Sequence, residues 1–348
     1  MAPALPADVG RVLRDGAVIP AHPLALDASR RLDERRQRAL TRYYLASGAG
    51  GIAIAVHTTQ FEIHEPRRGL LEPVLALTAD VLDHEADRPL VRIAGVVGDT
   101  AQAVREAELA AGLGYHAVLL SPRVAGATEE SLLERAAAVG DVLPVIGFYL
   151  QEAIGGPVLS RSFWRRFADL PSVVAVKAAP FDRYRTAELV RGVAESARAD
   201  EVSLYTGNDD AIVADLTAVH HVGGRELRFA GGLLGQWAVG TRAATRVLDL
   251  AKRHHRGEHA ASAELAALAA DLTDLNAAVF DPVNGFAGVI AGVHEVLRQQ
   301  GLLAGVWCLD EAETLSPGQA AEIERVRLAY PHLGDDAFIA EHRDEWLR

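Results

Sequence analysis

The sequence predicts an α/β fold, a (β/α)8 barrel of the TIM type with a C-terminal helical appendage. Short apolar runs alternate eight times with longer amphipathic segments between residues 18 and 253, which is typical of repeated strand–helix units. The apolar runs are nearly continuous, as expected of parallel strands buried on both faces. One such barrel needs about 250 residues, and the chain has 348. We therefore expect the barrel over residues 12–255 and a helical region packed on it over residues 256–348.

The predicted strands are short, apolar and bounded by polar or glycine-containing segments. They cover residues 18–26, 51–59, 90–98, 116–122, 143–150, 172–180, 201–207 and 226–232. A doubly wound sheet is the alternative for repeated strand–helix units, but eight closely spaced units favour the closed barrel.

The segments between the strands are amphipathic, and several begin with a capping residue. Thr100, Thr128 and Ser160 each precede or open an apolar periodic run, which is typical of helix N-termini. The helices predicted around the barrel are 32–48, 72–85, 100–114, 128–140, 160–170, 185–199, one from about residue 209, and 237–253. Beyond residue 256 the strands stop, and the segments 260–280, 285–301 and 317–330 are predicted to be helical.

Composition excludes several classes of partner. The formal net charge is −12 and no basic run is present, which argues against nucleic acid or an anionic membrane surface. No charge-free apolar stretch reaches about 18 residues, so no membrane span is predicted, and the N-terminal segment lacks the apolar core of a signal peptide. Cys308 is the only cysteine, so no internal disulfide can form and a cytoplasmic location is expected.

Chemistry in such barrels lies at the C-terminal ends of the strands. The polar residues and glycines at the predicted strand ends are His22, His57, Thr58, Thr59, Ser121, Tyr149, Lys177, Thr206, Asn208, Asp209 and the glycines of 230–235, among them Gly232. Their spacing predicts no metal site, and residues 230–235 lack the spacing of a dinucleotide or phosphate-loop motif. We therefore expect neither a metal nor a cofactor.

Lys177 is the strongest catalytic candidate. Lys177 and Lys252 are the only lysines in a chain that otherwise uses arginine for its cations. Lys252 lies in a basic helix end and is expected to be a solvated charge, whereas Lys177 follows four apolar residues at a predicted strand end. Burial lowers the pKa of a lysine, and a neutral amine can form an imine with a ketone, which arginine cannot do. The alternative is a lysine paired with a distant carboxylate.

Tyr149 ends the preceding predicted strand. Its phenol could reach the cavity of Lys177 and move a proton to and from the carbinolamine. A tyrosine at the edge of the core, with its hydroxyl satisfied by the protein, explains the residue equally well.

Two threonines and two histidines are candidates for substrate binding. Thr58 and Thr59 end a strand where backbone N–H groups and hydroxyls can hold a carboxylate, although adjacent threonines on strands are often only β-formers. His22 and His57 are expected to be structural or to contact substrate.

These residues carry a resemblance to the dihydrodipicolinate synthase / N-acetylneuraminate lyase family of class I, Schiff-base-forming aldolases. The segment PVIGFYLQEAIGGPVLSRSFWRRFADLPSVVAVKAAPFD resembles the family's tyrosine-containing strand, its helix and the strand with the imine lysine, and HTTQFE resembles its double-threonine loop. The resemblance implies that Lys177 forms the Schiff base and that Tyr149 is the acid/base. It also implies that Thr58 and Thr59 bind the carboxylate of a 2-oxo acid, and that the chain forms a dimer or tetramer.

The chain departs from the family at three places, which indicates a divergent member and not a true dihydrodipicolinate synthase. His57 replaces the glycine before the threonines, Ser121 and its neighbours replace the tyrosines of a proton relay, and Ile154 stands where an arginine binds the second substrate. His22, His57 and Gln151 are then candidates for contacting a different second substrate, and Gly232 lies at the end of strand eight, where a phosphate could bind.

Three functions follow in order of preference. The first is a lyase or aldolase that acts on pyruvate or another 2-oxo acid through Lys177. The second is a catalytically altered relative that binds an oxo acid or a partner without turnover. The third is a phosphate-binding barrel enzyme that uses the glycines after strand eight.

Overall fold

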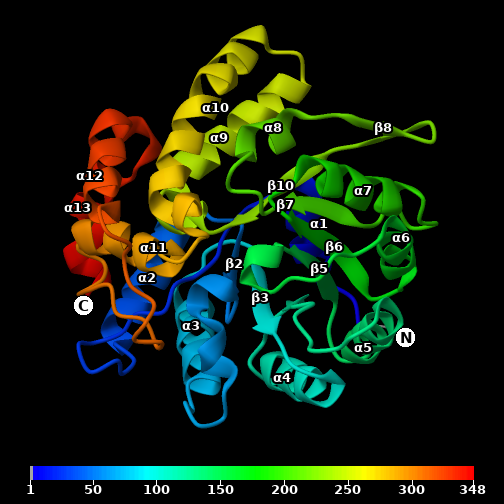
Figure 1. Ribbon diagram of the computed structural model, residues 1–348, viewed down its shortest axis with the longest axis horizontal. Helices are drawn as coiled ribbons and strands as arrows, with labels where there is room; N and C mark the ends of the chain where they lie inside the picture. Colours follow the sequence, from blue (N-terminus) through cyan, green and yellow to red (C-terminus); the bar gives the residue numbers. More distant parts are fainter. Residues whose placement is uncertain (1–2) are drawn as a thin grey trace.

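A computed structural model describes residues 3–348, and its eight parallel strands form a barrel with helices around it (Figure 1). The barrel strands are β1 (Val18–Pro20), β2 (Gly51–Ile54), β3 (Val91–Val96), β4 (Ala117–Leu120), β5 (Val145–Leu150), β6 (Val173–Ala179), β7 (Ser203–Thr206) and β10 (Phe229–Leu234). They are hydrogen-bonded in the order β1-β10-β7-β6-β5-β4-β3-β2. A parallel bridge between Ala21 and Ala53 joins β1 to β2 and closes the barrel. The predicted (β/α)8 barrel is confirmed.

The eighth barrel strand differs from its predicted range. Residues 225–227 do not belong to the barrel; they form β9 (Arg225–Leu227), which pairs antiparallel with β8 (His220–Val222). Gly223 and Gly224 have φ values of 57° and 80°, the conformation that a two-residue hairpin turn requires. The hairpin projects away from the barrel (Figure 1), and the barrel strand β10 starts two residues after the hairpin ends.

Helices follow the barrel strands in sequence. They are α2 (Glu34–Ala46), α3 (Leu71–Glu85), α4 (Thr100–Gly112), α5 (Glu129–Gly140), α6 (Arg161–Asp169), α7 (Arg183–Ala194), α8 (Ile212–Thr217) and α9 (Thr241–His255). Two predicted caps are confirmed: Thr128 Oγ1 accepts a hydrogen bond from Ser131 N, and Ser160 Oγ accepts one from Phe163 N. The cap of α4 is Asp99 and not Thr100, since the Asp99 carboxylate accepts from Gln102 N.

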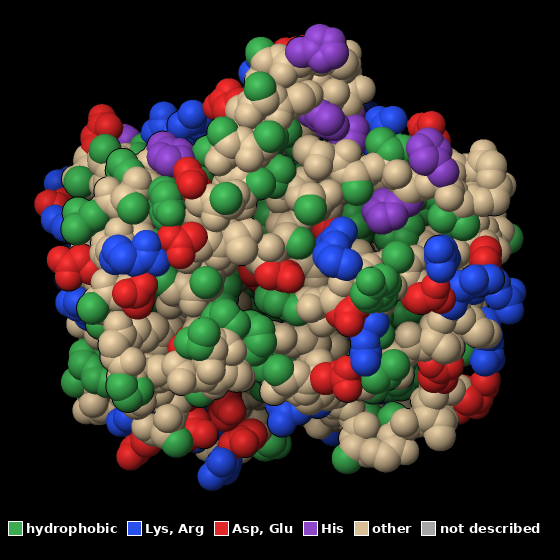
Figure 2. Space-filling model, turned by 45° about the horizontal axis from the view of Figure 1, so that its top comes forward, with side chains coloured by type: hydrophobic (Ala, Val, Ile, Leu, Met, Phe, Trp, Pro, Cys, Tyr) green, Lys and Arg blue, Asp and Glu red, His purple; other side chains and the backbone are tan. Residues whose placement is uncertain are grey.

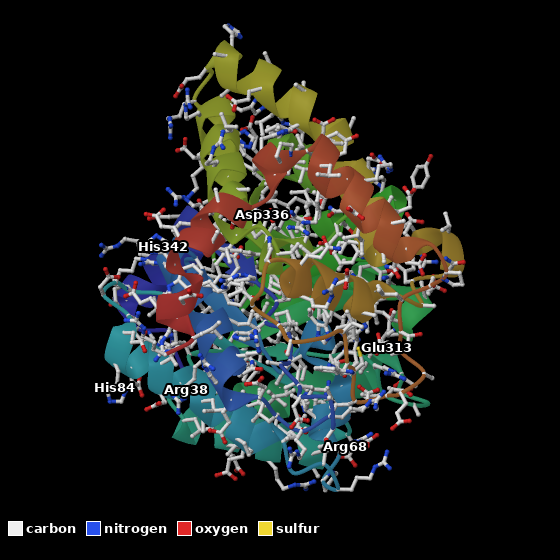
Figure 3. The ribbon with its side chains drawn as sticks, turned by 90° about the vertical axis from the view of Figure 1, so that its left-hand side faces the viewer. Arg38, Arg68, His84, Glu313, Asp336 and His342 are labelled. Atoms are coloured by element: carbon white, nitrogen blue, oxygen red, sulfur yellow. The ribbon has the colours of Figure 1, made fainter. Side chains whose placement is uncertain are left out.

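Four further helices form the C-terminal region. They are α10 (His259–Phe280), α11 (Val289–Gln299), α12 (Gln319–Ala329) and α13 (Asp336–Trp346); the last was not predicted. Helix α10 packs on α8 and α9, and α13 packs on α2, as the view in Figure 3 shows for the C-terminal end of the chain. In residues 3–348 no helix combines the length and the apolar character needed to cross a membrane.

The core has two layers. The larger one lies between the strands and the surrounding helices, and a smaller one fills the barrel with side chains such as Ile93, Ile146 and Leu233. Helix α1 (Ala7–Asp15) adds Val9 and Leu13 to this inner layer. The hydroxyl of Tyr205, inside the barrel, donates to Leu13 O at 2.7 Å and accepts from Ala17 N at 3.1 Å. Helix α1 therefore seals the N-terminal end of the barrel.

Acidic and basic side chains are interspersed over the face of the molecule in Figure 2. Many arginines form ion pairs with exposed carboxylates, such as Arg42 with Glu85 and Arg161 with Glu195. The formal net charge of the whole chain is −12, but on this face acidic and basic side chains alternate and do not form one acidic area.

Asp335 ties the C-terminal helices to the barrel. Its buried carboxylate accepts hydrogen bonds from the Tyr43 hydroxyl (2.6 Å), from Arg242 N (2.7 Å) and from Ala243 N (2.9 Å). Arg242 and Ala243 belong to the first turn of α9, whose free N–H groups favour a negative charge. One side chain thus links α2, α9 and the start of α13.

Replacing Asp335 with alanine should reduce the free energy of unfolding by roughly 2–4 kcal/mol, because three buried donors lose a charged acceptor. Urea unfolding followed by circular dichroism measures the change. Asp344→Ala is the matched control: this carboxylate also lies on α13, but its side chain is 81% exposed, and its removal should leave the midpoint in place. Equal midpoints for both variants would contradict the linking role of Asp335.

Candidate active site

Lys177 lies on β6 with its side chain directed into the barrel. It is 7% exposed, and its Nζ lies 4.4 Å from the centre of the Phe148 ring. Phe148 is its neighbour on β5 in the parallel register. Ala175 and Ala179, two residues away on either side along β6, belong to the same inner layer, as the two-residue period of a strand requires. The amine therefore sits over an aromatic face in apolar surroundings.

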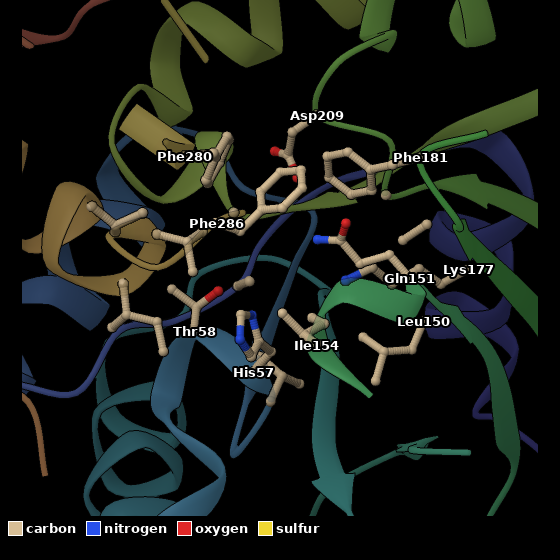
Figure 4. Close-up of a pocket in the computed structure, with 18 of the residues that line it drawn as sticks. His57, Thr58, Leu150, Gln151, Ile154, Lys177, Phe181, Asp209, Phe280 and Phe286 are labelled. Atoms are coloured by element: carbon tan, nitrogen blue, oxygen red, sulfur yellow. The ribbon is translucent and has the colours of Figure 1, made fainter. Parts of the chain in front are cut away.

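A pocket opens around this amine at the C-terminal ends of the strands (Figure 4). It holds about 590 Å³ of empty space when its open mouth is included. Its lining comes from β5 and β6, from the segments that follow β1, β2, β5, β6, β7 and β10, and from the C-terminal region. The lining residues are Ala21, Val56, His57, Thr58, Phe148, Leu150, Gln151, Ile154, Lys177, Ala179, Phe181, Gly207, Asp209, Gly235, Phe280, Phe286, Val289, Ile290 and Val293.

Asp209 is the acidic partner of Lys177 in the pocket. It follows β7, is 8% exposed, and its Oδ1 accepts a hydrogen bond from Gln236 N at 2.9 Å. Burial lowers the pKa of Lys177 to about 8, although the Asp209 carboxylate acts in the opposite direction. Burial likewise raises the pKa of Asp209 to about 7. Both groups therefore change their charge near neutrality and do so as a coupled pair.

Gly207 makes room for the lysine side chain. A Cβ at this position would lie 2.4 Å from Lys177 Cε and 2.8 Å from Ala179 Cβ. Gly207 N also donates to Ala178 O at 2.7 Å, which continues the pairing of β6 and β7 beyond the strand end. The backbone at residue 207 is therefore held close to the aliphatic part of Lys177, where only glycine fits.

His57 and Thr58 lie together on one side of the pocket, and Gln151 and Lys177 lie on the other side (Figure 4). Burial is the main reason why the pKa of His57 is lowered to about 4, and the positive charges of Lys177 and Arg123 lower it further. The imidazole is therefore neutral at pH 7. Thr58 and Gln151 are buried to more than nine-tenths. These three neutral side chains supply polar contacts without adding charge to the pocket.

Three of the predicted binding residues do not line the pocket. His22 points outward from β1 to α2, where Nδ1 lies 2.8 Å from Pro23 O and Nε2 lies 3.0 Å from Thr41 Oγ1. Thr59 donates its hydroxyl to His22 O at 2.7 Å and so supports the junction of β1 and β2. A side chain at Gly232 would meet the Trp237 ring at 2.7 Å, so this glycine serves packing, and Gly235 lines the pocket instead.

Tyr149 also lies away from Lys177. It belongs to the outer layer of the core, between the barrel and α6, and its ring packs 5.2 Å from that of Trp164. Its hydroxyl lies 3.4 Å from Leu159 N and 3.5 Å from Leu159 O. Neighbouring residues on a strand point to opposite faces, so Phe148 faces Lys177 and Tyr149 cannot. The expected pairing of the phenol with the amine is not present.

The sequence predicts Lys177, His57, Thr58 and Gln151 as site residues, and all four line one pocket. Asp209 lines the same pocket, but the sequence analysis assigns it no role. Asp209 was visible as a polar residue after strand seven, and its position was the available signal. No feature of the sequence indicates that Phe280, Phe286 and the α11 residues line the pocket, because their positions depend on how the C-terminal helices pack. Among residues 3–348, no three His, Cys, Asp or Glu side chains gather in a way that could hold a metal ion.

Solved structures of dihydrodipicolinate synthases have the same fold. No protein-family model and no curated protein matches the chain by sequence. The structure is similar to dihydrodipicolinate synthase from Oceanobacillus iheyensis, with a TM-score of 0.73 and 17% identity over 93% of this chain and 99% of that chain. It is also similar to a monomeric dihydrodipicolinate synthase variant, with a TM-score of 0.74 and 19% identity over 94% of this chain and 99% of that one.

A third similar structure is a prophage protein of the dihydrodipicolinic acid synthase family from E. coli, solved in complex with pyruvate. Its TM-score is 0.74, at 15% identity over 91% of this chain and 98% of that one. An N-acetylneuraminate lyase-type protein from Clostridium difficile, in complex with mannosamine, has a TM-score of 0.72 and 14% identity over 90% of this chain and 99% of that one. The chain therefore has the fold of these proteins over nearly its whole length.

Replacing Gly207 with alanine should lower the free energy of unfolding by roughly 1–3 kcal/mol, the usual effect of overpacking a filled site. Thermal unfolding measures it. The matched control is Gly112→Ala in the last turn of α4, where a Cβ meets no atom within 4 Å and no loss is expected. If Gly207→Ala were as stable as the parent chain, Lys177 would have an alternative position at no cost, and the close fit described above would be incorrect.

Proposed function

We propose that the protein is a Schiff-base lyase or aldolase that acts on pyruvate or another 2-oxo acid through Lys177. One observation carries the proposal: a buried primary amine with a lowered pKa at the C-terminal mouth of a barrel. A neutral amine attacks a ketone, and barrels of this type carry their chemistry at this end. The fold shared with dihydrodipicolinate synthases and the resemblance around Lys177 support the same chemistry.

The proposed cycle needs only water and protons besides the substrate. In the cleavage direction, Nζ of Lys177 adds to the C2 carbonyl of a 4-hydroxy-2-oxo acid, and loss of water gives a protonated imine. The electron pair of the C3–C4 bond moves into the imine as the C4 hydroxyl releases its proton, so an aldehyde leaves and an enamine remains. The enamine takes up a proton at C3, and water hydrolyses the imine to return the amine and the shortened 2-oxo acid. Synthesis is the reverse.

Asp209 is our candidate for the group that moves these protons. It lines the same pocket as Lys177, and the two groups interact electrostatically. A carboxyl whose pKa is raised to about 7 by burial can both accept and release a proton at neutral pH, as acid–base catalysis requires. Phe148 faces the amine from β5 and has no proton to transfer, so the pocket offers Asp209 for this role.

The carboxylate of the 2-oxo acid is assigned to the neutral polar side chains of the pocket. Thr58 offers a hydroxyl, Gln151 an amide N–H, and His57 a neutral imidazole that can donate one hydrogen bond. Hydrogen bonds to a carboxylate are stronger than those to a neutral acceptor, so a few neutral donors are enough. Ile154 lines the same pocket, where the resemblance would place an arginine for a second carboxylate.

The placement of Tyr149 favours a second candidate, a relative that binds an oxo acid without turnover. The phenol that the resemblance assigns to acid–base catalysis lies outside the pocket. Reversible imine formation with no turnover of any aldehyde or 4-hydroxy-2-oxo acid would support this reading. A phosphate-binding enzyme is not proposed, because in the lining of the described pocket Lys177 is the only ammonium or guanidinium group and has the Asp209 carboxylate beside it.

The remaining expectations are predictions about the whole protein. They are a homodimer or homotetramer, a cytoplasmic location, and function with neither a metal nor a cofactor. One of the similar solved structures is described as a monomeric variant, so sedimentation of the purified chain is the direct measurement of its oligomeric state.

Borohydride reduction in the presence of pyruvate should attach a reduced pyruvyl group to Lys177, and peptide mass spectrometry locates it. Lys177→Arg should abolish the adduct, since a guanidinium does not form an imine. Lys252→Arg is the matched control because it removes the only other lysine, and this variant should be labelled as the parent chain is. Labelling of Lys252, or of neither lysine with any of a panel of 2-oxo acids, would refute the proposed role of Lys177.

The pH dependence of this trapping tests the coupling of Lys177 to Asp209. Trapping in the parent chain should increase as pH rises through about 8, where the amine becomes neutral. The Asp209 carboxylate raises the pKa of Lys177, so Asp209→Asn should move the midpoint of the profile to lower pH while slowing turnover. Asp210→Asn, which removes the adjacent exposed carboxylate, should leave the midpoint closer to that of the parent chain. A midpoint that moves upward in Asp209→Asn would contradict the pairing.

A further inference from the structure

The mouth of the Lys177 pocket is built from hydrocarbon. Three phenylalanine rings lie together on one side of it, those of Phe181, Phe280 and Phe286 (Figure 4). Val289, Ile290 and Val293 on α11 extend this wall. The wall therefore joins residues that follow β6 to the loop and helices of the C-terminal region, and we refer to these six residues as the aromatic wall.

Phe181 is held in an unfavourable backbone conformation by a buried polar network. Its φ is 52°, a region that large residues rarely adopt. Its N–H donates to Asn208 Oδ1 at 3.0 Å. Asn208 is 1% exposed, and its amide nitrogen donates to Thr186 Oγ1 at 3.1 Å and to Asp215 Oδ2 at 2.9 Å. This network fixes the ring of Phe181 at the pocket.

Phe286 is held in a similar way in the loop that follows α10. Its φ is 67°, and its N–H donates to Asp281 O at 3.0 Å. Asp281 itself has a φ of 56° and is 4% exposed, and its carboxylate accepts from Asn284 Nδ2, Ser316 Oγ and Gly288 N. The rings of Phe181 and Phe286 meet edge to face, with centroids 5.5 Å apart and planes at 77°.

Two such conformations have a cost that function must explain. A strained non-glycine residue costs on the order of 1–3 kcal/mol and persists only where its surroundings enforce it. Here the buried side chain of Asn208 holds Phe181 and the backbone carbonyl of the buried Asp281 holds Phe286, and the two rings line one pocket. Residues in such conformations cluster at binding and active sites, and these two rings line the pocket of Lys177.

The aromatic wall also decides which substituent can occupy the pocket. A sugar-like chain would place its hydroxyls against rings and aliphatic side chains that cannot accept or donate hydrogen bonds, and each unpaired polar group costs about 1–3 kcal/mol. An aryl or branched alkyl group gains about 25 cal/mol for each Å² it removes from water. His57 and Thr58 lie on the opposite side of the pocket, whereas the Asp209 carboxyl group lies on the side of the rings (Figure 4).

We propose that the aldehyde released or consumed at this site is apolar, with an aryl or branched alkyl group that packs on the aromatic wall. The inference rests on the proposed lyase function and specifies its substrate class. The reaction is the cleavage of a 4-aryl- or 4-alkyl-4-hydroxy-2-oxo acid into a 2-oxo acid and an apolar aldehyde, by the steps given above, or its reverse. The 2-oxo acid end lies at Lys177 and the neutral polar side chains, and the hydrocarbon end lies under the three rings.

The test uses the full chain with pyruvate and a set of aldehydes, and it follows aldol addition by chromatography. We expect kcat/KM for benzaldehyde and isobutyraldehyde to exceed that for glyceraldehyde and glyceraldehyde 3-phosphate by at least about tenfold, the discrimination usual for a hydrophobic pocket. Equal or higher values for the two polar aldehydes, with pyruvate still trapped on Lys177, overturn the apolar substrate class and leave the lyase proposal standing. If no 2-oxo acid is trapped on Lys177, the lyase proposal fails first and this inference fails with it.

Phe286→Asn supplies a second, independent measurement. Asparagine accepts a positive φ more readily than phenylalanine, so the backbone of the loop should be kept while the ring is lost. The variant should lose the preference of the parent chain for benzaldehyde over glyceraldehyde, and an unchanged circular dichroism spectrum shows that it is folded. Val283→Asn, in the same loop with a side chain that is 90% exposed, is the matched control and should keep the preference. An unchanged preference in Phe286→Asn would contradict the role of the ring.

Discussion

The site depends on the burial of one amine beside one carboxyl group. Lys177 is enclosed by apolar side chains and lies over the Phe148 ring, and Asp209 is buried next to it. Burial disfavours the charged form of each group, and their mutual attraction favours it. Burial is the larger effect for both groups, so the pKa of Lys177 falls to about 8 and the pKa of Asp209 rises to about 7. The glycine at 207 and the small residues around Lys177 allow this arrangement without displacing the strands.

Much of the fold could be predicted because its signals are local. The eight apolar runs mark strands buried on both faces, and the glycines and capping residues between them mark where helices end and begin. The eighth strand was misplaced because residues 225–227 are equally suited to a hairpin strand, and the pair Gly223–Gly224 that creates the hairpin was not recognised as a turn. The helix α13 was missed since its few buried residues, such as Ile339 and Trp346, give a weak periodic pattern.

The candidate site was only partly predictable, and the reason is the character of the strands. Every residue of β5 is buried, so the sequence contains no polar alternation to show which side chains point into the barrel. Tyr149 and Phe148 are therefore indistinguishable by pattern, and only the register with β6, in which Phe148 is opposite Lys177, decides between them. The same ambiguity applies to His22, whose neighbour Ala21 lines the pocket. The ambiguity about direction did not affect Lys177, because a lysine is rarely buried unless it takes part in chemistry.

The N-terminal helix has a consequence for the order of events at the site. Because α1 closes the far end of the barrel through Leu13 and Tyr205, small molecules reach Lys177 from the C-terminal ends of the strands, where Phe181 and Phe286 line the pocket. A group bonded to Lys177 then lies deeper than whatever occupies the entrance. Under the proposed lyase mechanism the 2-oxo acid fragment stays bonded to Lys177 as an enamine when the aldehyde forms, so the aldehyde is free to leave first.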